Sequence, residues 1–201
     1  RQRNAALRAR LAATEVRLWD TELVQAAETM DRQRRTYLDA LLPVLDGYIR
    51  TLVDLPGLSW DYRPGWSRKQ AFAEALAEGL EADRRQGFTR LGPHRADLVL
   101  TVDGVAAQER VSRGQQKQLV AALMLAQAEV YRLCRGRSSI FLVDDLASEL
   151  DAEHRQRVLA ALRALEVQVF ITAIEGTALE ASDWAVRRWF HVEHGQIQEV
   201  V

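Results

Sequence analysis

The sequence predicts an α/β protein in which a mostly helical arm, about residues 1–87, precedes an α/β unit, about residues 88–201. Two observations support this prediction. Apolar residues recur at steps of three, four or seven through the first part of the chain, as on one face of a helix. In the second part, an apolar run at 139–143, a helical pattern and another apolar run at 167–172 follow one another. That order is typical of a right-handed βαβ unit with parallel strands.

The composition excludes several classes of protein. With 48% hydrophobic and 27% charged residues over 201 positions, the chain can bury enough apolar surface to exclude bulk disorder. Cys134 is the only cysteine, which excludes a disulfide scaffold and indicates a reducing compartment, so we expect a cytoplasmic protein. No apolar stretch is long enough to span a membrane, and the net charge of −1 does not by itself indicate nucleic-acid binding. Because residue 1 is Arg, we expect a piece of a longer chain.

The expected helices of the arm follow from apolar spacing and from breaker residues. Residues 1–35 lack Gly and Pro and carry one apolar stripe, which predicts a single long helix: Leu7, Leu11, Leu18, Leu23, Ala27 and Met30. A second helix is expected over 36–52, with a break or restart at Pro43. A short strand is expected over 58–62, where apolar and polar residues alternate between two Pro-Gly pairs. A helix over 67–85 follows and ends at a glycine.

The α/β unit is expected to contain two hairpins and the βαβ unit. Asp103-Gly104 is a hairpin turn pair between two short strands, and the apolar run at 139–143 predicts a strand that is buried on both faces. The expected elements, in order, are strands 97–102 and 105–107, helix 114–135, strand 139–143, helix 152–165, strand 167–172, and a closing hairpin of strands 189–193 and 196–200.

Two acids, Asp144 and Asp145, follow the apolar strand directly. Ligands of open α/β sheets bind at the carboxyl ends of the strands. A carboxylate at that position can hold Mg²⁺ on a nucleotide, and a second acid can orient or deprotonate an attacking water. Two solvated acids at the end of a buried strand would give the same pattern. The pair alone therefore does not distinguish a nucleotide site from acids that only end the strand.

Two further motifs have both a structural and a functional interpretation. Ser112-Arg113-Gly114-Gln115-Gln116 stands where a long helix begins, and a serine hydroxyl, a glycine and a helix N-terminus together form an anion site. The same residues are a capping box, with Ser112 as N-cap and Gln115 reaching back, and the two roles are compatible. Ser148-Glu149-Leu150-Asp151 is an ordinary loop by itself, with Ser148 or Asp151 as the N-cap of helix 152–165.

The order and spacing of these three motifs resemble the second half of an ABC-type (P-loop NTPase) ATPase head, where they are the signature motif, the Walker B strand and the D-loop. Finer details are similar to the RecF family. Ser-x-Gly-Gln-Gln replaces the Ser-Gly-Gly-Gln of transporters, and Asp145 stands where Rad50 and SMC heads carry Glu. Segments 62–66 and 92–98 also resemble RecF segments. The resemblance implies the C-terminal half of an ABC-type head preceded by a mostly helical arm, which is an inserted domain.

The resemblance also implies the residue roles. Asp144 would bind Mg²⁺ and Asp145 would be catalytic. Ser112, Gly114 and Gln115 would bind the ATP that is held by a second copy of the protein. Ser148 and Asp151 would belong to the D-loop.

RecF proteins are ATP-dependent, DNA-binding dimers of recombinational repair that act with RecO and RecR to help load RecA at DNA gaps. The resemblance therefore implies a homodimer formed on ATP binding, with ATP and Mg²⁺ as cofactors. It implies DNA with gaps or junctions of single and double strands, and RecO- and RecR-like proteins, as partners. His94 and Arg95 are candidates for DNA contact. The structural alternative is a turn after Gly92-Pro93 that bonds to the head.

The sequence departs from a complete ABC-type head in two ways. It has no Gly-Lys-[Ser/Thr] P-loop, so we expect the chain alone to be inactive. ABC heads also usually place a His after the strand that follows the D-loop. Here Thr172 stands in that region and is a candidate to face the nucleotide instead. Two other interpretations remain open: a non-enzymatic helical interaction module, and another ABC-type head of the Rad50 or SMC kind.

Overall fold

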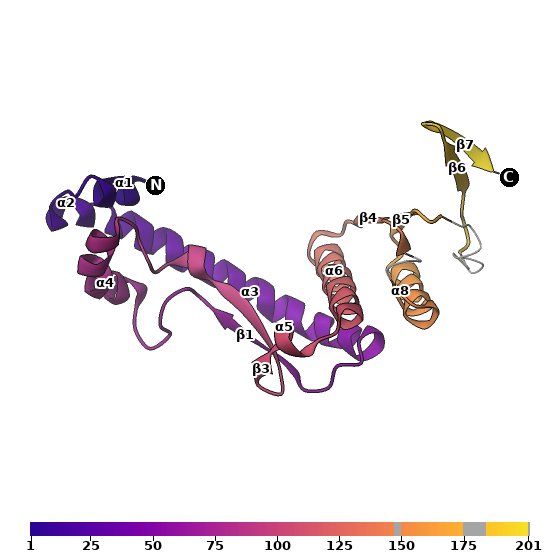
Figure 1. Cartoon of the computed structure of the whole chain (residues 1–201), viewed down its shortest axis with the longest axis horizontal. Coiled ribbons are helices and arrows are strands. Elements are labelled where there is room, and N and C mark those ends of the chain that lie inside the picture. Colours follow the sequence, from indigo (N-terminus) through magenta and orange to yellow (C-terminus); the bar gives the residue numbers. More distant parts are fainter. Residues whose placement is uncertain (147–149, 175–183, 201) are drawn as a thin grey trace. The chain divides into compact units, whose positions relative to one another are not determined.

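The computed structural model describes residues 1–146, 150–174 and 184–200 (Figure 1). Contacts between residues divide the chain into two compact units. The first, unit 1, comprises Arg1–Asp46 and Asp54–Ser112, and the second, unit 2, comprises Gly47–Val53 and Arg113–Val201. The expected boundary near residue 87 separates an inserted arm domain from an ATPase head. The two units are defined only by contacts within this chain, so that boundary stays a prediction.

The beginning of unit 1 contains three helices instead of the predicted one, so the prediction of one long helix over the first 35 residues is wrong. The helices are α1 (Gln2–Arg8), α2 (Ala13–Arg17) and α3 (Asp20–Leu52). The chain turns at Arg10, which has a left-handed φ of 55°. Turning there lets Leu7 and Val16 pack with Leu80 of a later helix, and this burial outweighs the helical preference of the segment.

The predicted break at Pro43 is also wrong, because α3 continues through it. A proline inside a helix removes one backbone hydrogen bond and costs about 3 kcal/mol. Leu41 and Leu45 on either side of it are each 2% exposed. Burying two leucines contributes roughly 3–6 kcal/mol, so the packed face can hold the helix together.

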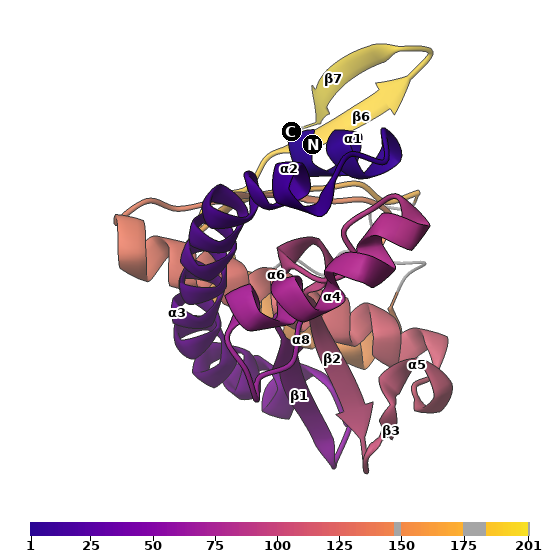
Figure 2. The ribbon, with the colours of Figure 1, turned by 90° about the vertical axis from the view of Figure 1, so that its left-hand side faces the viewer.

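A three-stranded antiparallel sheet completes unit 1, in the order β1 (Leu58–Arg63), β2 (Asp97–Val102) and β3 (Val105–Ala106). The predicted Asp103-Gly104 turn joins β2 to β3, and both of its residues have positive φ, as this type of hairpin turn requires. Figure 2 shows α3 beside β1 and β2. Three further helices belong to this unit: α4 (Phe72–Gln86), the 3₁₀ turn η1 (Pro93–Arg95) and α5 (Ala107–Arg110).

Helix α4 begins at Phe72 rather than at Ser67, and it ends at Gly87 as expected. The late start has a local cause. The Glu74 carboxylate accepts a hydrogen bond from the Ala71 backbone N–H, which caps the helix there, and Ser67 instead accepts a bond from the Lys69 N–H in the preceding turn. Phe72 packs against Trp66 with ring centroids 4.5 Å apart.

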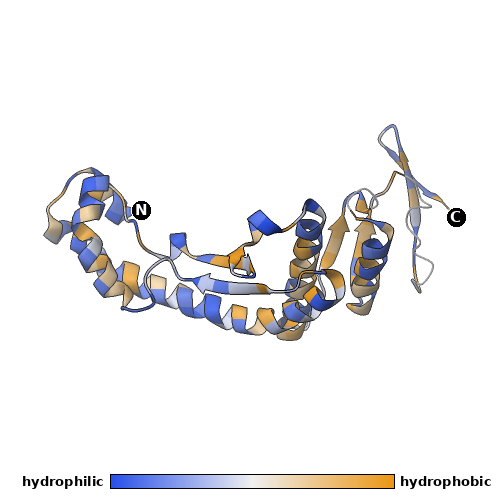
Figure 3. Ribbon diagram, turned by 60° about the horizontal axis from the view of Figure 1, so that its bottom comes forward, coloured by the Kyte–Doolittle hydropathy of each residue, from blue (hydrophilic) through white to orange (hydrophobic). Residues whose placement is uncertain are grey.

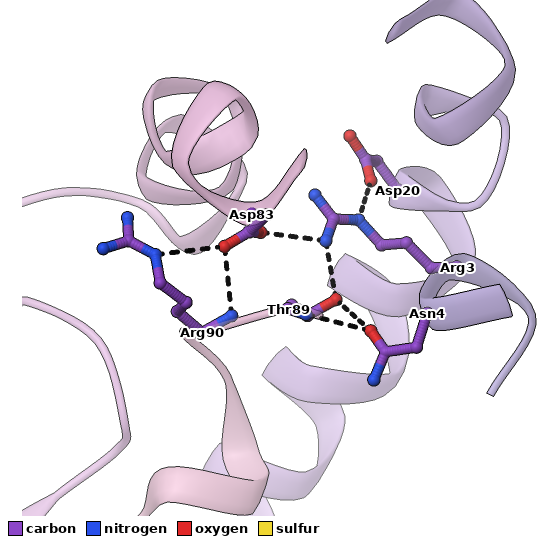
Figure 4. Close-up of polar contacts among 6 residues, drawn as sticks. All are labelled: Arg3, Asn4, Asp20, Asp83, Thr89 and Arg90. Carbon is purple, nitrogen blue, oxygen red and sulfur yellow. Dashed lines mark hydrogen bonds and ion pairs between the residues drawn. The ribbon is translucent and has the colours of Figure 1, made fainter. Parts of the chain in front are cut away.

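A buried polar network joins α1, α3 and α4 (Figure 4). Arg3 is 4% exposed and donates to Asp20 (2.7 Å), Asp83 (2.9 Å) and Thr89 (2.6 Å). Asp83 is 2% exposed and also accepts from the backbone and the side chain of Arg90. Asn4 accepts from the N–H and the hydroxyl of Thr89, so nearly every buried polar atom of the network has a partner.

Unit 2 contains the predicted βαβ unit, because strands β4 and β5 pair in parallel and helix α8 lies between them in the sequence. Its elements are α6 (Arg113–Arg135), β4 (Ile140–Val143), α8 (Ala152–Ala164), β5 (Gln168–Ile171), β6 (Trp189–Glu193) and β7 (Gln196–Val200). Strands β6 and β7 form the predicted closing hairpin. Tyr48, at the end of α3, donates to Glu129 of α6 at 2.7 Å, and burial raises the pKa of this Tyr48 hydroxyl.

The expectation that β4 is buried on both faces is wrong for this chain. One face packs on a cluster around Leu146 and Leu159, but Ile140 and Leu142 are 62% and 79% exposed. Figure 3 colours β4 and β5 as strongly hydrophobic. The described residues therefore cover only one side of a strand whose sequence is suited to burial on both.

Candidate functional site

The acid pair lies at the carboxyl end of β4, where a single side chain of the neighbouring strand bonds to both acids. The Thr172 hydroxyl, one residue past the end of β5, donates to Asp144 Oδ1 at 2.5 Å. The same hydroxyl accepts the Asp145 backbone N–H at 2.9 Å. The Thr172 N–H donates to the Val143 carbonyl at 3.0 Å and so extends the parallel ladder by one bond. Sequence reasoning pointed to Thr172 as facing a nucleotide and missed its bonds to the acids.

A cavity of about 590 Å³ in unit 2 is bordered by Asp144 and by the first turns of α6. Arg113, Gln116 and Lys117 contribute polar and cationic groups there, and the rest of the lining comes from apolar residues of α6, β4 and α8. The start of α6 and the carboxyl end of β4 therefore border one cavity.

The chemistry of Asp144 fits a magnesium ion. A carboxylate oxygen is a hard ligand of the kind that Mg²⁺ prefers, and Mg²⁺ bound to phosphates commonly takes only one or two carboxylates from the protein. Thr172 donates to Oδ1 of Asp144, so Oδ2 is the carboxylate oxygen that this bond leaves for a cation. No group of three or more His, Cys, Asp or Glu side chains that could hold a metal occurs among the described residues.

The Ser-x-Gly-Gln-Gln motif begins α6 as predicted, with Ser112 directly before the first helical residue, Arg113. Ser112 and Gly114 are exposed, and Gln115 is partly buried. The first backbone N–H groups of an α-helix have no partner within the helix, so an exposed helix start can receive an anion. The nucleotide roles of these three residues stay predictions.

Asp151 is the N-cap of α8, which decides between the two caps expected from the sequence. Its carboxylate accepts the His154 backbone N–H at 3.0 Å and contacts the His154 ring at 2.7 Å. These bonds from His154, the backbone bond first, hold the pKa of the Asp151 carboxyl below its usual range. The other D-loop candidate, Ser148, lies outside the described residues.

The two segments that resemble RecF in the first half of the chain lie against each other. The Gly92 N–H donates to the Gly65 carbonyl at 3.1 Å, and a Cβ on Gly65, whose φ is +97°, would lie 2.1 Å from the Gly92 carbonyl oxygen. Arg34 of α3 donates to the Pro93 carbonyl at 2.7 Å and so fixes the turn. His94 and Arg95 are exposed on that turn, in unit 1, and their DNA contact stays a prediction.

The fold and the order of motifs define the class of the protein. A parallel β4–α8–β5 unit with an acid pair at the strand end, preceded by a long helix that starts with Ser-x-Gly-Gln-Gln, is the C-terminal lobe of an ABC-type ATPase head with a mostly helical arm before it. No helix among the described residues is long and apolar enough to cross a membrane.

Within that class, the chain belongs to the RecF family. It is 43% identical over 197 residues to the DNA replication and repair protein RecF of Thioalkalivibrio sulfidiphilus, covering 98% of this chain and 55% of that protein. It is also 43% identical over 204 residues to RecF of Stutzerimonas stutzeri, covering 100% of this chain and 55% of that protein. No known protein-family profile matches the chain.

A solved structure described as the recombination mediator protein RecF-ATP in the RecFOR pathway has a similar fold. It matches with a TM-score of 0.79 at 20% identity and covers 100% of this chain and 55% of that one. The chain thus spans about half the length of the relatives it matches and corresponds to their C-terminal half.

Proposed function

We propose that this chain is the C-terminal part of a RecF-like ATP-dependent protein of DNA replication and repair, acting in the bacterial cytoplasm. The observation that carries the proposal is the acid pair Asp144-Asp145 at the end of a parallel strand, where Asp144 borders the same cavity as the start of α6. The curated relatives are named for DNA replication and repair, and the solved neighbour is described with ATP, which supports ATP as the ligand.

In this proposal the chain's own residues divide the work on the nucleotide. Asp144 holds Mg²⁺, which neutralises charge on the phosphates when it is bound. Asp145 orients the attacking water and accepts its proton. Neither acid can bind the triphosphate by itself, so the P-loop must come from the half of the protein that this chain does not contain, and the chain alone is inactive.

A second copy of the protein completes the site. Ser112 and the backbone N–H of Gly114 in that copy donate to the terminal phosphate, and Gln115 lines the same corner; their place at a helix start suits an anion. Ser148 and Asp151 lie on the D-loop that follows the acids. Loss of the terminal phosphate removes charge from between the two copies, which lowers their affinity and opens the dimer.

Dimer closure would couple the nucleotide to DNA and to other repair proteins. The exposed pair His94-Arg95 is the proposed DNA contact, at gaps or at junctions of single and double strands. RecO- and RecR-like proteins are the proposed partners, and help in loading RecA is the proposed outcome, because the solved neighbour is described as a recombination mediator in the RecFOR pathway.

The test is steady-state ATP hydrolysis by the complete protein and by its Asp145→Asn variant. Losing a general base typically costs about 100- to 10,000-fold in rate, so we expect hydrolysis to fall at least about 100-fold. Asp103→Asn is the matched control. Like Asp145, Asp103 directly follows a strand and has a left-handed φ, which is 50° at Asp103 and 46° at Asp145. Asp103 lies on the β2–β3 turn of unit 1 and has no proposed role in hydrolysis. Hydrolysis by Asp145→Asn at the wild-type rate would show that the role assigned to this acid is wrong.

A further inference from the structure

Thr172 has a backbone that is fixed by its neighbours and a side chain that is exposed. Ile171 and Ala173 pack on the buried cluster around Leu146 and Leu159. Because successive side chains of a strand point to opposite faces, the Thr172 side chain points away from that cluster, and it is exposed. Its position is therefore set by the fold, whereas its hydroxyl is directed to the end of β4.

One hydroxyl can donate one hydrogen bond and accept others, and Thr172 uses both capacities on the acid pair. It donates to the Asp144 carboxylate, which fixes one oxygen and leaves Oδ2 as the atom available to a cation. It accepts the Asp145 backbone N–H, at a residue whose φ of 46° is a conformation that non-glycine residues seldom adopt. Thr172 therefore sets the orientation of one acid and the backbone turn from which the other projects.

The exposure of these groups argues against a purely structural role. A buried polar group needs a protein partner, but an exposed carboxylate and an exposed N–H can be satisfied by water at little cost to the fold. Asp144 and Thr172 are both exposed. The bonds are therefore not needed to hold the strands together, and what they supply is a defined geometry.

We propose that Thr172 is a positioning residue for the acid pair, which holds the Asp144 carboxylate and the Asp145 backbone in the arrangement used for hydrolysis. This inference rests on the proposed ATPase function and deepens it. Partners that orient metal-binding carboxylates typically contribute about 10- to 100-fold to activity or metal affinity.

The experiment compares Thr172→Val, which keeps the shape and removes the hydroxyl, with Thr172→Ser, which keeps the hydroxyl, in the complete protein. We expect kcat for ATP hydrolysis to fall about 10- to 100-fold in Thr172→Val and to be restored by Thr172→Ser. KM for ATP should stay within about twofold, because in this proposal Thr172 orients the acids and makes no contact with the bound ATP. Thr101→Val is the control, because the Thr101 side chain also forms an exposed hydrogen bond to a neighbouring strand, to Ser59 in unit 1.

A second readout needs no nucleotide. Amide hydrogen exchange over residues 143–146 should be faster in Thr172→Val than in wild type, and as slow as wild type in Thr172→Ser, because the Asp145 N–H loses its acceptor only in the first. Wild-type kcat in Thr172→Val, or equal loss in both variants, would overturn the positioning role. If the unaltered complete protein did not hydrolyse ATP, the proposed function itself would be wrong, so the two failures are distinguishable.

Discussion

In unit 1, the polar side chains of Arg3, Asp83 and Thr89 are buried and bond to one another (Figure 4), whereas in unit 2 those of Asp144 and Thr172 are exposed and bond at a strand end. The first network joins helices that are far apart in sequence. The second joins Thr172 to the exposed Asp144 carboxylate and to the backbone of the partly buried Asp145. Buried polar bonds of the first kind stabilise a fold, whereas exposed bonds of the second kind contribute little to stability and are compatible with the proposed nucleotide site.

Both units bury apolar side chains, but the strand that carries the acids in unit 2 also exposes some of its own. In unit 1, Phe72 and Leu76 are each 1% exposed. In unit 2, Leu142 is 79% exposed and Ile174 is 90% exposed. Ile140 and Leu142 share one exposed face of β4, and an exposed apolar strand face is typical of a surface that another segment or protein covers.

The largest expected effect on stability lies in the buried network. Replacing Asp83 with Ala leaves the guanidinium of Arg3 buried with an incomplete set of partners, which typically costs about 3–5 kcal/mol. Native-state hydrogen exchange of peptides from α1 and α4 in the complete protein measures this loss. Glu81→Ala is the control, because Glu81 pairs with Arg84 on the surface and exposed pairs contribute under about 1 kcal/mol. Equal effects of the two substitutions would contradict the comparison.

A smaller, pH-dependent effect is expected at the N-cap of α8. The pKa of the Asp151 carboxyl is lowered in the folded state, so the folded protein binds this proton less readily than the unfolded chain does. The stabilisation is therefore present above the usual carboxyl pKa of about 4 and is lost as pH falls through the lowered value. The protection of α8 against hydrogen exchange, relative to the intrinsic rate at each pH, should fall over that range in the wild type.

Asp151→Asn separates the cap from the charge. Asparagine is as good an N-cap as aspartate, but it does not titrate. The variant should keep α8 protected and lose this part of the acid dependence, whereas Asp151→Ala should lose protection at every pH. If the protection of α8 in Asp151→Asn depended on pH as it does in the wild type, another titrating group would be the cause.

The smallest effect on stability is expected at the acid pair itself. Asp144→Asn removes an exposed charge, and exposed substitutions away from caps and cores usually change stability by about 0.5 kcal/mol or less. ATP hydrolysis by the same complete variant should fall sharply. Thermal unfolding and hydrolysis measured together check this, and a large loss of stability in Asp144→Asn would remove the distinction between the two networks.

The sequence predicted what depends on local patterns. The parallel pair β4–β5 follows from two apolar runs around a helical pattern, and both hairpins follow from their turn pairs. The start of α6 follows from a capping motif, and the end of α4 follows from Gly87.

Features that depend on distant residues were not predicted. The turn at Arg10 and the continuity of α3 through Pro43 are decided by packing partners that no local pattern shows. Arg3 bonds to Asp83, and Thr172 bonds to Asp144, across long separations in sequence. A lone threonine after a strand carries no signal of such a bond, so the candidate site needed the structure.

The central claim is that acids from one copy and the Ser112–Gly114 corner of another act on the same nucleotide. Mixing the complete Asp145→Asn and Ser112→Arg variants tests it directly, because a mixed dimer contains one site that is wild type in both parts. We predict that two inactive preparations regain about a quarter of the wild-type ATP hydrolysis per subunit when they exchange partners freely. No recovery, with mixed dimers demonstrably formed, would contradict a site shared between two copies.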